Sequence, residues 1–237
     1  MENTGYATIT RQSGLLREMA VIAHNIANAS TTGYRQEGLV FSEFVHRLAE
    51  GPSLSMALGD AKTTSFLQGT LTETGGAFDL AIEGDGFFLI ETPDGNMLSR
   101  AGSFSPNAEG DLVTMSGHRV LDAGGAPVFI PPDADKLQIA ADGTLSHEGR
   151  AIGQIGLFAP VEGDRLTRRD GVLFQTEDEP EPVEDASIVQ GFLEASNVDP
   201  ISQMARMIEV QRAYEMGQSF LEAENERVRS VLQTLTR

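Results

Sequence analysis

The chain has 237 residues, with 17 Lys plus Arg against 35 Asp plus Glu, so its formal net charge is −18. This length suits one large domain or two small ones, and the charge balance argues against a broad basic surface for nucleic acid. Cysteine is absent, which excludes disulfides, thiolate metal sites and cysteine nucleophiles. No stretch approaches the roughly 18 consecutive apolar residues of a membrane span, and the N-terminus lacks a signal-peptide pattern. We therefore expect no direct membrane insertion and no cleaved signal peptide.

The acidity is concentrated in the middle of the chain. Residues 61–186 carry 8 basic and 22 acidic side chains, whereas residues 1–60 carry 4 and 6, and residues 187–237 carry 5 and 7. The hydrophobic pattern changes at about the same places. This indicates that the middle is one structural unit and that the two ends form another.

A helix is predicted over about residues 4–28. Its apolar side chains form one stripe at helical spacing: Ile9, Leu16, Met19, Ala23 and Ile26. Residues 28–33 then end the helix, because Asn and Gly tolerate the left-handed conformation and small hydroxyl residues favour turns. Tyr34 and Arg35 follow, and two interpretations of them stay open: an anchor for a contact, or a ring that closes over its own helix end.

The middle of the chain has a hydrophobic period of two, which predicts an antiparallel β domain over residues 76–194. Residues 79–83 and 87–91 are predicted strands joined by a tight turn at 84–86, and a second turn is predicted at 93–96. Residues 177–185 are too acidic and proline-rich to pack, so we expect a solvated loop. The preceding residues 36–75 mix a short apolar pattern with a Gly-, Ser- and Thr-rich run, and we expect an extended connector there.

A longer helix is predicted from Asp199, as N-cap, and Pro200, at the first helical position, to the end of the chain. Alternating steps of three and four place one narrow heptad seam along it: Met207, Val210, Tyr214, Gly217, Leu221, Glu224, Val228, Val231 and Leu235. So narrow a seam needs a helical partner. Apolar residues also lie off the principal seams, at Leu15, Ile22 and Ile208, so pairing between the two helices would leave apolar surface exposed. That surplus favours assembly with other copies.

The expected fold class is therefore α+β. N- and C-terminal α-helices, in residues 1–35 and 195–237, form a coiled-coil-like assembly domain. They flank the central antiparallel all-β domain at 76–194, and the connector occupies 36–75.

Candidate catalytic chemistry is sparse. Asp79, Glu83 and Asp85 are acidic residues near one predicted turn, and paired carboxylates can cleave glycosides, but clusters arise easily among 35 acidic residues. The Gly-Asp turns match no calcium loop, and the glycines form no phosphate-binding loop. The histidines are scattered singly, which argues against zinc: His24, His46, His118 and His147. We expect no catalytic centre, metal or cofactor, and we expect His24 on the helix surface.

Three segments, in order along the chain, carry a family resemblance. The first is VIAHNIANASTTGYR at 21–35. The second comprises QGTLTETG at 68–75, DLAIEGDGFF at 79–88 and RAGSF at 100–104, and the third comprises EASNVD at 194–199 and QRAYE at 211–215. They resemble the signatures of the bacterial flagellar axial proteins, the rod and hook subunits, and the modest length is most similar to the proximal-rod members. Departures are small: His24 replaces a usual Asn, and 98–99 replace a Tyr-Thr pair.

The resemblance implies a structural subunit of the proximal rod in the flagellar basal body. Such a subunit would polymerise with other rod subunits and with copies of itself, its helices forming an inner layer and its β domain lying outside, and would transmit torque for motility. Export by the flagellar type III apparatus without a cleaved signal, and a location spanning the periplasm, are also implied. The expected assembly residues combine the helical stripes with the turn after the first helix: Leu16, Met19, Ala23, Asn25, Ile26, Asn28, Thr32, Gly33, Tyr34, Met207, Val210, Tyr214, Leu221, Val228, Val231 and Leu235.

Three alternatives stay open. One is a distal-rod subunit of the same family. The second is a secreted acidic β-domain hydrolase that uses Asp79, Glu83 or Asp85. The third is a self-contained α+β binding module whose two helices pair within the monomer.

Overall fold

The structure is a computed structural model that describes residues 2–46, 54–132, 137–183 and 185–235, with side chains described for 8–41, 61–132, 137–183 and 185–234. The chain divides into two compact units. The helical unit comprises Met1–Ala29, Gln36–Phe66 and Val198–Arg237, and the β unit comprises Ser30–Arg35 and Leu67–Asn197. The chain is α+β overall.

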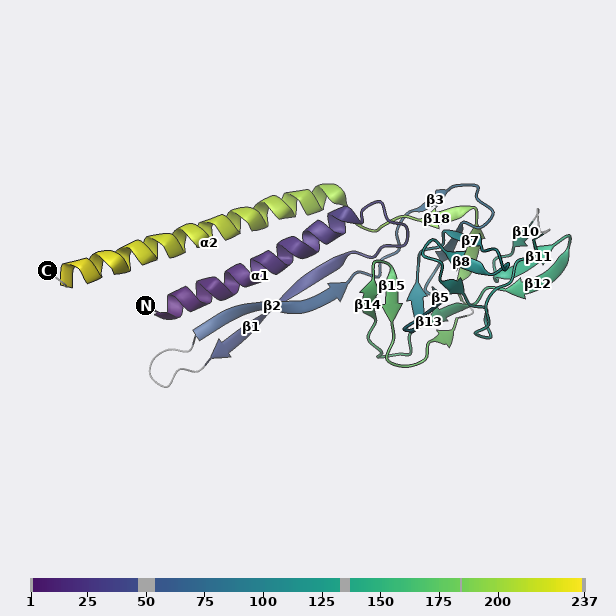
Figure 1. Cartoon of the computed structure of the whole chain (residues 1–237), viewed down its shortest axis with the longest axis horizontal. Helices are drawn as coiled ribbons and strands as arrows, with labels where there is room; N and C mark the ends of the chain where they lie inside the picture. Colours follow the sequence, from purple (N-terminus) through teal and green to yellow (C-terminus); the bar gives the residue numbers. More distant parts are fainter. Residues whose placement is uncertain (1, 47–53, 133–136, 184, 236–237) are drawn as a thin grey trace. The chain divides into compact units, whose positions relative to one another are not determined.

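The helical unit contains α1 (Glu2–Ala27), the strands β1 (Glu37–His46) and β2 (Leu54–Thr64), and α2 (Pro200–Leu235). Within it, α1 lies between α2 on one side and the hairpin β1–β2 on the other (Figure 1). Both predicted helices are present, and each begins and ends within two residues of its expected bounds. Within the described residues, no helix combines the length and hydropathy that crossing a membrane requires.

The contact between α1 and α2 uses a different stripe of α1 from the predicted one. Leu15, Ile22 and Val210 form a small core, against which Met19, Ile26, Met207, Ala213 and Tyr214 pack. The two stripes of α1 share Met19 and Ile26, but Leu16 is 48% exposed and Ala23 is also exposed. Because neighbouring residues on a helix point about 100° apart, the sequence alone does not distinguish two adjacent stripes that share members.

The N-cap of α2 gives a prediction about pH. Hydrogen bonds from the Ser202 hydroxyl and the Ile201 N–H hold the pKa of Asp199 below its ordinary value of 3.8. The folded state therefore favours the carboxylate, so its contribution to stability is present above the unfolded pKa and is lost as the pH falls through the folded pKa. We expect the thermal melting temperature to fall more steeply below about pH 4 than in Asp199→Asn, whose amide caps without titrating. Melting curves by circular dichroism test this, and parallel pH profiles would contradict it.

Residues 36–66, expected as part of an extended connector, instead contain the hairpin β1–β2. The register runs from Glu37 opposite Thr64 to His46 opposite Leu54, with a bulge between Val40 and Phe41. Gly14 explains how the hairpin approaches α1, because a Cβ there would lie 2.8 Å from Cε1 of Phe41. The short apolar pattern in these residues was therefore part of a strand and not of a connector.

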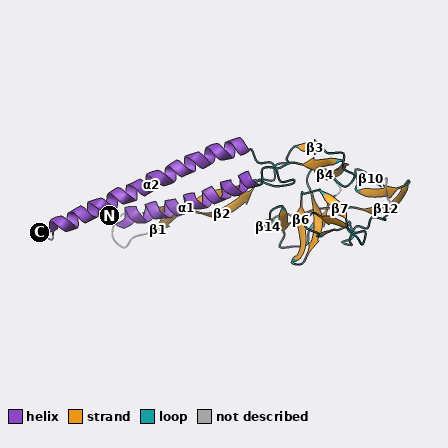
Figure 2. Ribbon diagram, turned by 45° about the horizontal axis from the view of Figure 1, so that its top comes forward, coloured by secondary structure: helices purple, strands orange, loops and turns teal. Residues whose placement is uncertain are grey.

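The β unit consists of short antiparallel strands (Figure 2). Its largest sheet has the order β14-β15-β6-β5-β9-β8-β7, with β13 and β16 beside it. The strands are β3 (Leu71–Glu73), β4 (Leu80–Glu83), β5 (Phe87–Thr92), β6 (Gly95–Ser99), β7 (Phe104–Pro106), β8 (Leu112–Thr114), β9 (Arg119–Val120), β10 (Leu137–Ile139), β11 (Thr144–His147), β12 (Arg150–Gln154), β13 (Leu157–Ala159), β14 (Thr167–Asp170), β15 (Leu173–Gln175), β16 (Glu181–Pro182), β17 (Ser187–Gln190) and β18 (Phe192–Glu194).

Strand β5 lies at the centre of this unit and is buried on both faces. Phe88 and Ile90 belong to one hydrophobic cluster, whereas Phe87 and Leu89 belong to a second. Since alternate residues of a strand point to opposite faces, the unbroken apolar run in β5 reflects cover on both sides.

The strands predicted around residues 79–91 are correct, but their pairing is not. The predicted hairpin would pair 79–83 with 87–91, whereas β4 pairs with β17 and β5 pairs with β6, β9 and β13. Gly84 and Gly86 have φ values of 99° and 150°, so the turn redirects the chain instead of closing a hairpin. The turn at 93–96 does close a hairpin, between β5 and β6. The predicted loop at 177–185 is mostly exposed but contains the two-residue strand β16.

Candidate functional site

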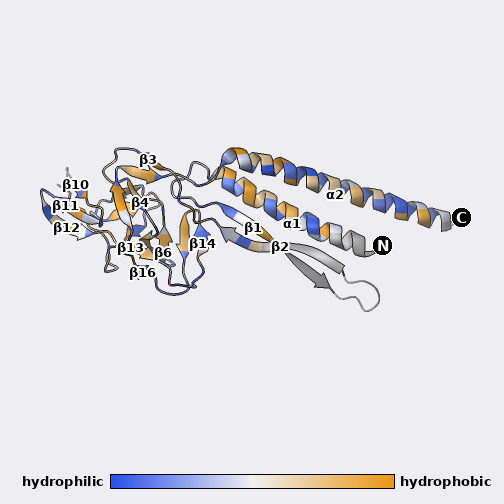
Figure 3. Ribbon diagram, turned by 180° about the vertical axis from the view of Figure 1, so that it is seen from behind, coloured by the Kyte–Doolittle hydropathy of each residue, from blue (hydrophilic) through white to orange (hydrophobic). Residues whose placement is uncertain are grey.

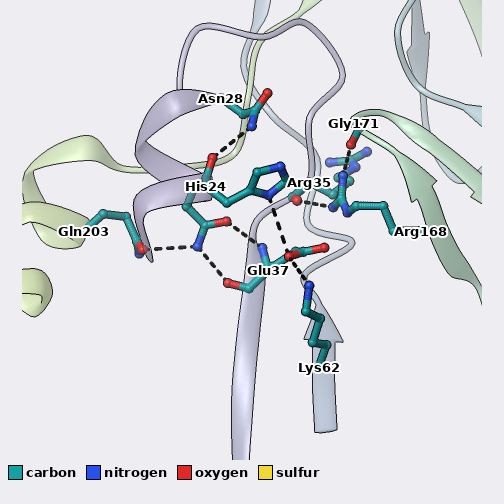
Figure 4. Close-up of polar contacts among 9 residues, drawn as sticks. His24, Asn28, Arg35, Glu37, Lys62, Arg168, Gly171 and Gln203 are labelled. Carbon is teal, nitrogen blue, oxygen red and sulfur yellow. Dashed lines mark hydrogen bonds and ion pairs between the residues drawn. The ribbon is translucent and has the colours of Figure 1, made fainter. Parts of the chain in front are cut away.

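Asn25 joins three elements of the helical unit. Its Nδ2 donates to the Glu37 carbonyl at 2.8 Å and to Gln203 Oε1 at 3.2 Å, and its Oδ1 accepts from the Glu37 N–H at 2.9 Å. The side chain is 1% exposed and so meets β1 and α2 from inside the unit. Figure 4 shows Gln203 and Glu37 on either side of this contact. Asn25 therefore fixes the packing of α1, β1 and α2 rather than only the turn that follows α1.

An ion pair also joins α1 and α2. Arg206 of α2 places Nη2 2.7 Å and Nε 2.8 Å from Glu18 Oε1 on α1. The hydrogen bond from this arginine to Glu18 raises the pKa of Arg206. Because Glu18 itself is 8% exposed, the pair is partly shielded from water and contributes to the register of the two helices.

The helix α1 ends directly before a residue that the sequence indicated, Asn28. Asn28 donates twice to the His24 carbonyl at the end of α1, from its backbone N–H at 3.1 Å and from its side-chain Nδ2 at 2.9 Å. His24 is 46% exposed on the helix surface, as expected, with its Nδ1 3.8 Å from Glu37 Oε2. The next predicted residues, Thr32, Gly33 and Tyr34, belong to the β unit.

The β unit buries a cluster of charged side chains. Glu194 lies 2.8 Å from Arg35 Nη2 and 3.4 Å from Arg100 Nη1, and the three residues are 1%, 1% and 3% exposed. Glu194 Oε1 also accepts a hydrogen bond from the Gly69 N–H at 2.9 Å. Each of the three segments that carry the sequence resemblance contributes one charged residue, so the cluster ties them together.

Burial is the largest influence on the pKa values of the two buried arginines, Arg35 and Arg100. Removal from water lowers the pKa of Arg35 and of Arg100, and the charge of Glu194 opposes that shift. A third guanidinium lies close by, since Arg168 stacks 4.6 Å from the Tyr34 ring and 4.7 Å from the Phe174 ring and donates to the Arg35 carbonyl. Tyr34 is 0% exposed. It packs within the β unit, an arrangement that neither open interpretation of Tyr34 and Arg35 described.

Gly33 is held where a side chain does not fit, which gives a prediction. Its φ is 69°, and a Cβ would lie 2.3 Å from Ala101 N and 2.4 Å from the Arg100 carbonyl carbon. We expect Gly33→Ala to lower the free energy of unfolding of the β unit by about 3 kcal/mol, from backbone strain plus steric overlap.

Gly75→Ala is the matched control for that substitution. Gly75 has a similar φ of 71° but nothing within 4 Å of its Cβ position, so only the backbone strain of about 1 kcal/mol applies. Urea unfolding of both variants measures the difference. Equal losses of stability would show that the close approach at Gly33 is unimportant.

The predicted seam of α2 divides into two parts. Met207, Val210 and Tyr214 pack against α1, and Leu221 is half-buried. Val228 and Val231 are 40% and 53% exposed. The side chain of Leu235 lies outside the described residues. Among the seam residues whose side chains are described, the first part therefore packs most strongly within the chain.

The candidate carboxylates have ordinary surroundings. Asp79 accepts a hydrogen bond from the Thr74 hydroxyl at 2.6 Å, whereas Glu83 and Asp85 are exposed. Within the residues that the structure describes, no group of three or more His, Cys, Asp or Glu could hold a metal ion. His46 lies among the residues whose side chains are not described.

Sequence reasoning missed Arg100, Glu194, Glu18 and Gln203 as site residues. The signal for the first two was present, because Arg100 is the one charged residue in 95–108 and Glu194 is the one charged residue in 186–198. Such isolated charges are typical of buried ion pairs as well as of exposed positions, and only the tertiary structure distinguishes the two.

Three family models match the chain in consecutive regions. Residues 6–35 match the flagella basal body rod protein model, and residues 81–147 match the flagellar hook protein FlgE/F/G D1 domain. Residues 189–234 match the C-terminal domain of the flagellar basal body rod FlgEFG proteins. These regions include the first and third segments on which the resemblance was based and, from the second, residues 81–88 and 100–104, whereas residues 68–75 lie outside them.

Full-length relatives agree with these matches. The chain is 40% identical over 218 residues to the flagellar basal-body rod protein FlgF of Mesorhizobium japonicum, covering 91% of this chain and 90% of the relative. It is 38% identical over 246 residues to FlgF of Caulobacter vibrioides, covering 99% and 98%. It is 29% identical over 249 residues to FlgG of Bacillus subtilis, covering 93% and 94%. The chain therefore belongs to the flagellar basal-body rod protein family and is most like its FlgF members.

Proposed function

We propose that this chain is a structural subunit of the flagellar basal-body rod, of the proximal type, that assembles through its helical unit and has no catalytic role. It would join other rod subunits and copies of itself, and would transmit torque for motility. Family membership supports the rod assignment, and the FlgF relatives support the proximal type. Nothing in the relatives' names supports the hydrolase alternative.

The observation that carries the assembly role is the apolar surface that α2 leaves exposed. Its exposed apolar residues are spread along the whole helix. In Figure 3, hydrophobic (orange) and hydrophilic (blue) residues follow one another along α2. The exposed apolar residues are Ile201, Met204, Ile208, Met216, Phe220, Val228, Val231 and Leu232. So many large apolar side chains left exposed on one helix indicate that α2 needs more contacts than α1 supplies.

The finer parts of the proposal follow from that role. The stripe residues Leu16 and Ala23 on α1, and Val228, Val231 and Leu235 on α2, would contact neighbouring subunits in a coiled-coil-like inner layer. The β unit would lie outside this layer. Export by the flagellar type III apparatus and a location across the periplasm accompany the same proposal.

Leu221→Asp tests the assembly role. The substitution places a charge on the half-buried seam of α2, where rod assembly would bury it without a partner. We expect loss of swimming motility, with several-fold less of the protein recovered in purified basal bodies, while the β unit keeps its stability. The measurements are swimming diameter and immunoblots of basal bodies.

Asn225→Asp is the matched control, because it adds the same charge one turn along α2 at an exposed position. It should leave motility within the range of the unmodified protein. Normal motility of Leu221→Asp would overturn the assignment of Leu221 to the assembly seam.

A further inference from the structure

The chain passes between its two units four times, after residues 29, 35, 66 and 197. The first two passages enclose a short inserted loop, residues 30–35, which leaves the helical unit, packs in the β unit and returns. Tyr34 and Arg35 of this loop are 0% and 1% exposed, and the Gly33 N–H donates to the Glu194 carbonyl at 2.8 Å. Removing the inserted loop from the β unit would therefore expose a buried ring and a buried charged group that are both in place.

Asn197, the last residue of the β unit before the fourth passage, bonds to the other connections. Its backbone N–H donates to the Tyr34 carbonyl at 3.3 Å, and its Nδ2 donates to the Leu67 carbonyl at 2.8 Å. The Leu67 carbonyl also accepts from Arg35 Nη1, and the Arg35 carbonyl accepts from Arg168 (Figure 4). Asn197 thus ties the inserted loop, the segment that enters at Leu67 and its own segment together within the β unit.

In two of these connections, hydrogen-bonded residues of the two units are consecutive or nearly so. On the side of the helical unit, the Ser65 N–H donates to the Gln36 carbonyl at 2.9 Å. Gln36 follows Arg35 directly, and Phe66 is the one residue between Ser65 and Leu67. At most one residue therefore lies between the bonded residues of the two units along each of these connections.

The third connection, to α2, is equally short. Asn197 is followed by Val198, which is 7% exposed, and then by Asp199, whose Oδ1 caps α2 by accepting from the Ile201 N–H at 3.1 Å. A single short connection acts as a hinge, because a few backbone dihedrals absorb a change of orientation. Three short connections that are bonded together at one end restrain one another, because each has a fixed maximum length.

We propose that Asn197 closes these three connections into one joint through which the helical unit and the β unit turn together. Its hydrogen bonds keep the connection to α2 from moving away from the inserted loop and from the segment at Leu67 under a twisting force. Without them, the connection to α2 becomes a separate hinge. The inference rests on the proposed rod function, in which torque passes through the chain, and it adds the residue that couples the two units.

Distances between two spin labels, measured by pulsed electron paramagnetic resonance, test the joint in the purified full-length chain. The natural chain has no cysteine, so labels attach where Ala205→Cys on α2 and Gln138→Cys on β10 place them, both at exposed positions. We expect a narrow distance distribution. Asn197→Ala, which removes the bond to Leu67, should widen it at least twofold while both units keep their melting temperatures.

Asn107→Ala is the matched control. Asn107 Oδ1 accepts from the N–H groups of Glu109 and Asp111, each at 2.9 Å, in the turn between β7 and β8. The same substitution there also removes side-chain hydrogen bonds of the β unit, but not those of the connections, so the width should equal that of the unmodified chain. A broad distribution in the unmodified chain, or equal widths for Asn197→Ala and Asn107→Ala, would overturn the role of Asn197.

Swimming against high load provides the second arm. In a medium thickened with polymer, cells with Asn197→Ala should swim several-fold more slowly than cells with Asn107→Ala, because a yielding joint fails first where the torque is largest. A widened distribution together with equal swimming of the two strains would overturn the passage of torque through this joint. The distances are measured on the purified chain and do not depend on assembly, so absence of the chain from basal bodies would overturn the rod function alone.

Discussion

Replacing Glu194 by Gln lowers the free energy of unfolding of the β unit by about 3 kcal/mol, because it leaves the buried guanidinium groups of Arg35 and Arg100 without their carboxylate. Breaking one side of a buried ion pair costs more than the pair itself contributes, since the remaining charge is still out of water. Glutamine keeps the size of the side chain, so the loss reports the charge.

Tyrosine fluorescence measures this loss in the β unit alone. The chain has no Trp and three Tyr, and Tyr34 is the tyrosine of the β unit. Urea titrations in a background with Tyr6→Phe and Tyr214→Phe therefore follow that unit. Glu73→Gln is the control. Glu73 is an exposed glutamate on β3, and β3 pairs with β18, the strand that contains Glu194. Equal midpoints for the two variants would show that the buried cluster does not hold the unit together.

The second large effect is expected at the contact between the helices. Val210 is 2% exposed and packs on Leu15 and Ile22, so Val210→Asp buries a carboxylate with no cationic partner in that core. We expect the helical unit to lose roughly 4 kcal/mol and α2 to separate from α1. The far-ultraviolet helical signal should melt at a lower temperature, while the Tyr34 transition in the β unit stays unchanged.

Ile208→Asp is the matched control for Val210→Asp. Ile208 lies two residues away and is 50% exposed on another face of α2, so its substitution should change stability by at most about 0.5 kcal/mol. Destabilisation of both variants by the same amount would contradict the assigned faces of the helix. In cells, both should impair assembly, the first by unfolding the helical unit and the second by altering its outer surface.

Local signals in the sequence predicted the helices well. Asp199 and Pro200 mark the start of α2 because capping depends on residues that are adjacent in the chain, and Asn28 marks the end of α1 for the same reason. The period of two predicted the strands of the β unit, including β4 and β5. In each case the determining interactions are local.

Features that depend on distant residues were not predictable in this way. Strand β4 pairs with β17, more than a hundred residues along the chain, and nothing near residue 80 specifies that partner. The same holds for the buried contacts of Glu194 with Arg35 and Arg100, because a lone charge in a sequence does not indicate burial. The stripe of α1 that meets α2 was also missed, since Leu15 and Leu16 present adjacent faces of equal hydrophobicity.

The two units are stabilised by different kinds of contact. The β unit has two hydrophobic clusters and a buried charged cluster that joins residues 35, 100 and 194. The helical unit has one small core between its helices, an ion pair and the contacts of Asn25, and it leaves much of α2 exposed. This difference suits a rod subunit whose β unit makes all its packing contacts within one chain. The helical unit of such a subunit would bury its exposed apolar side chains against neighbouring subunits.

Analysis of basal bodies tests the central claim most directly. Hook–basal bodies are purified from cells with the gene and from cells in which it is deleted, and are examined by mass spectrometry and electron microscopy. A structural rod subunit should be present in the first preparation, and the deletion should leave rods that stop short and carry no hook. Complete rods with attached hooks in the deletion strain, or absence of the chain from basal bodies of unmodified cells, would contradict the account.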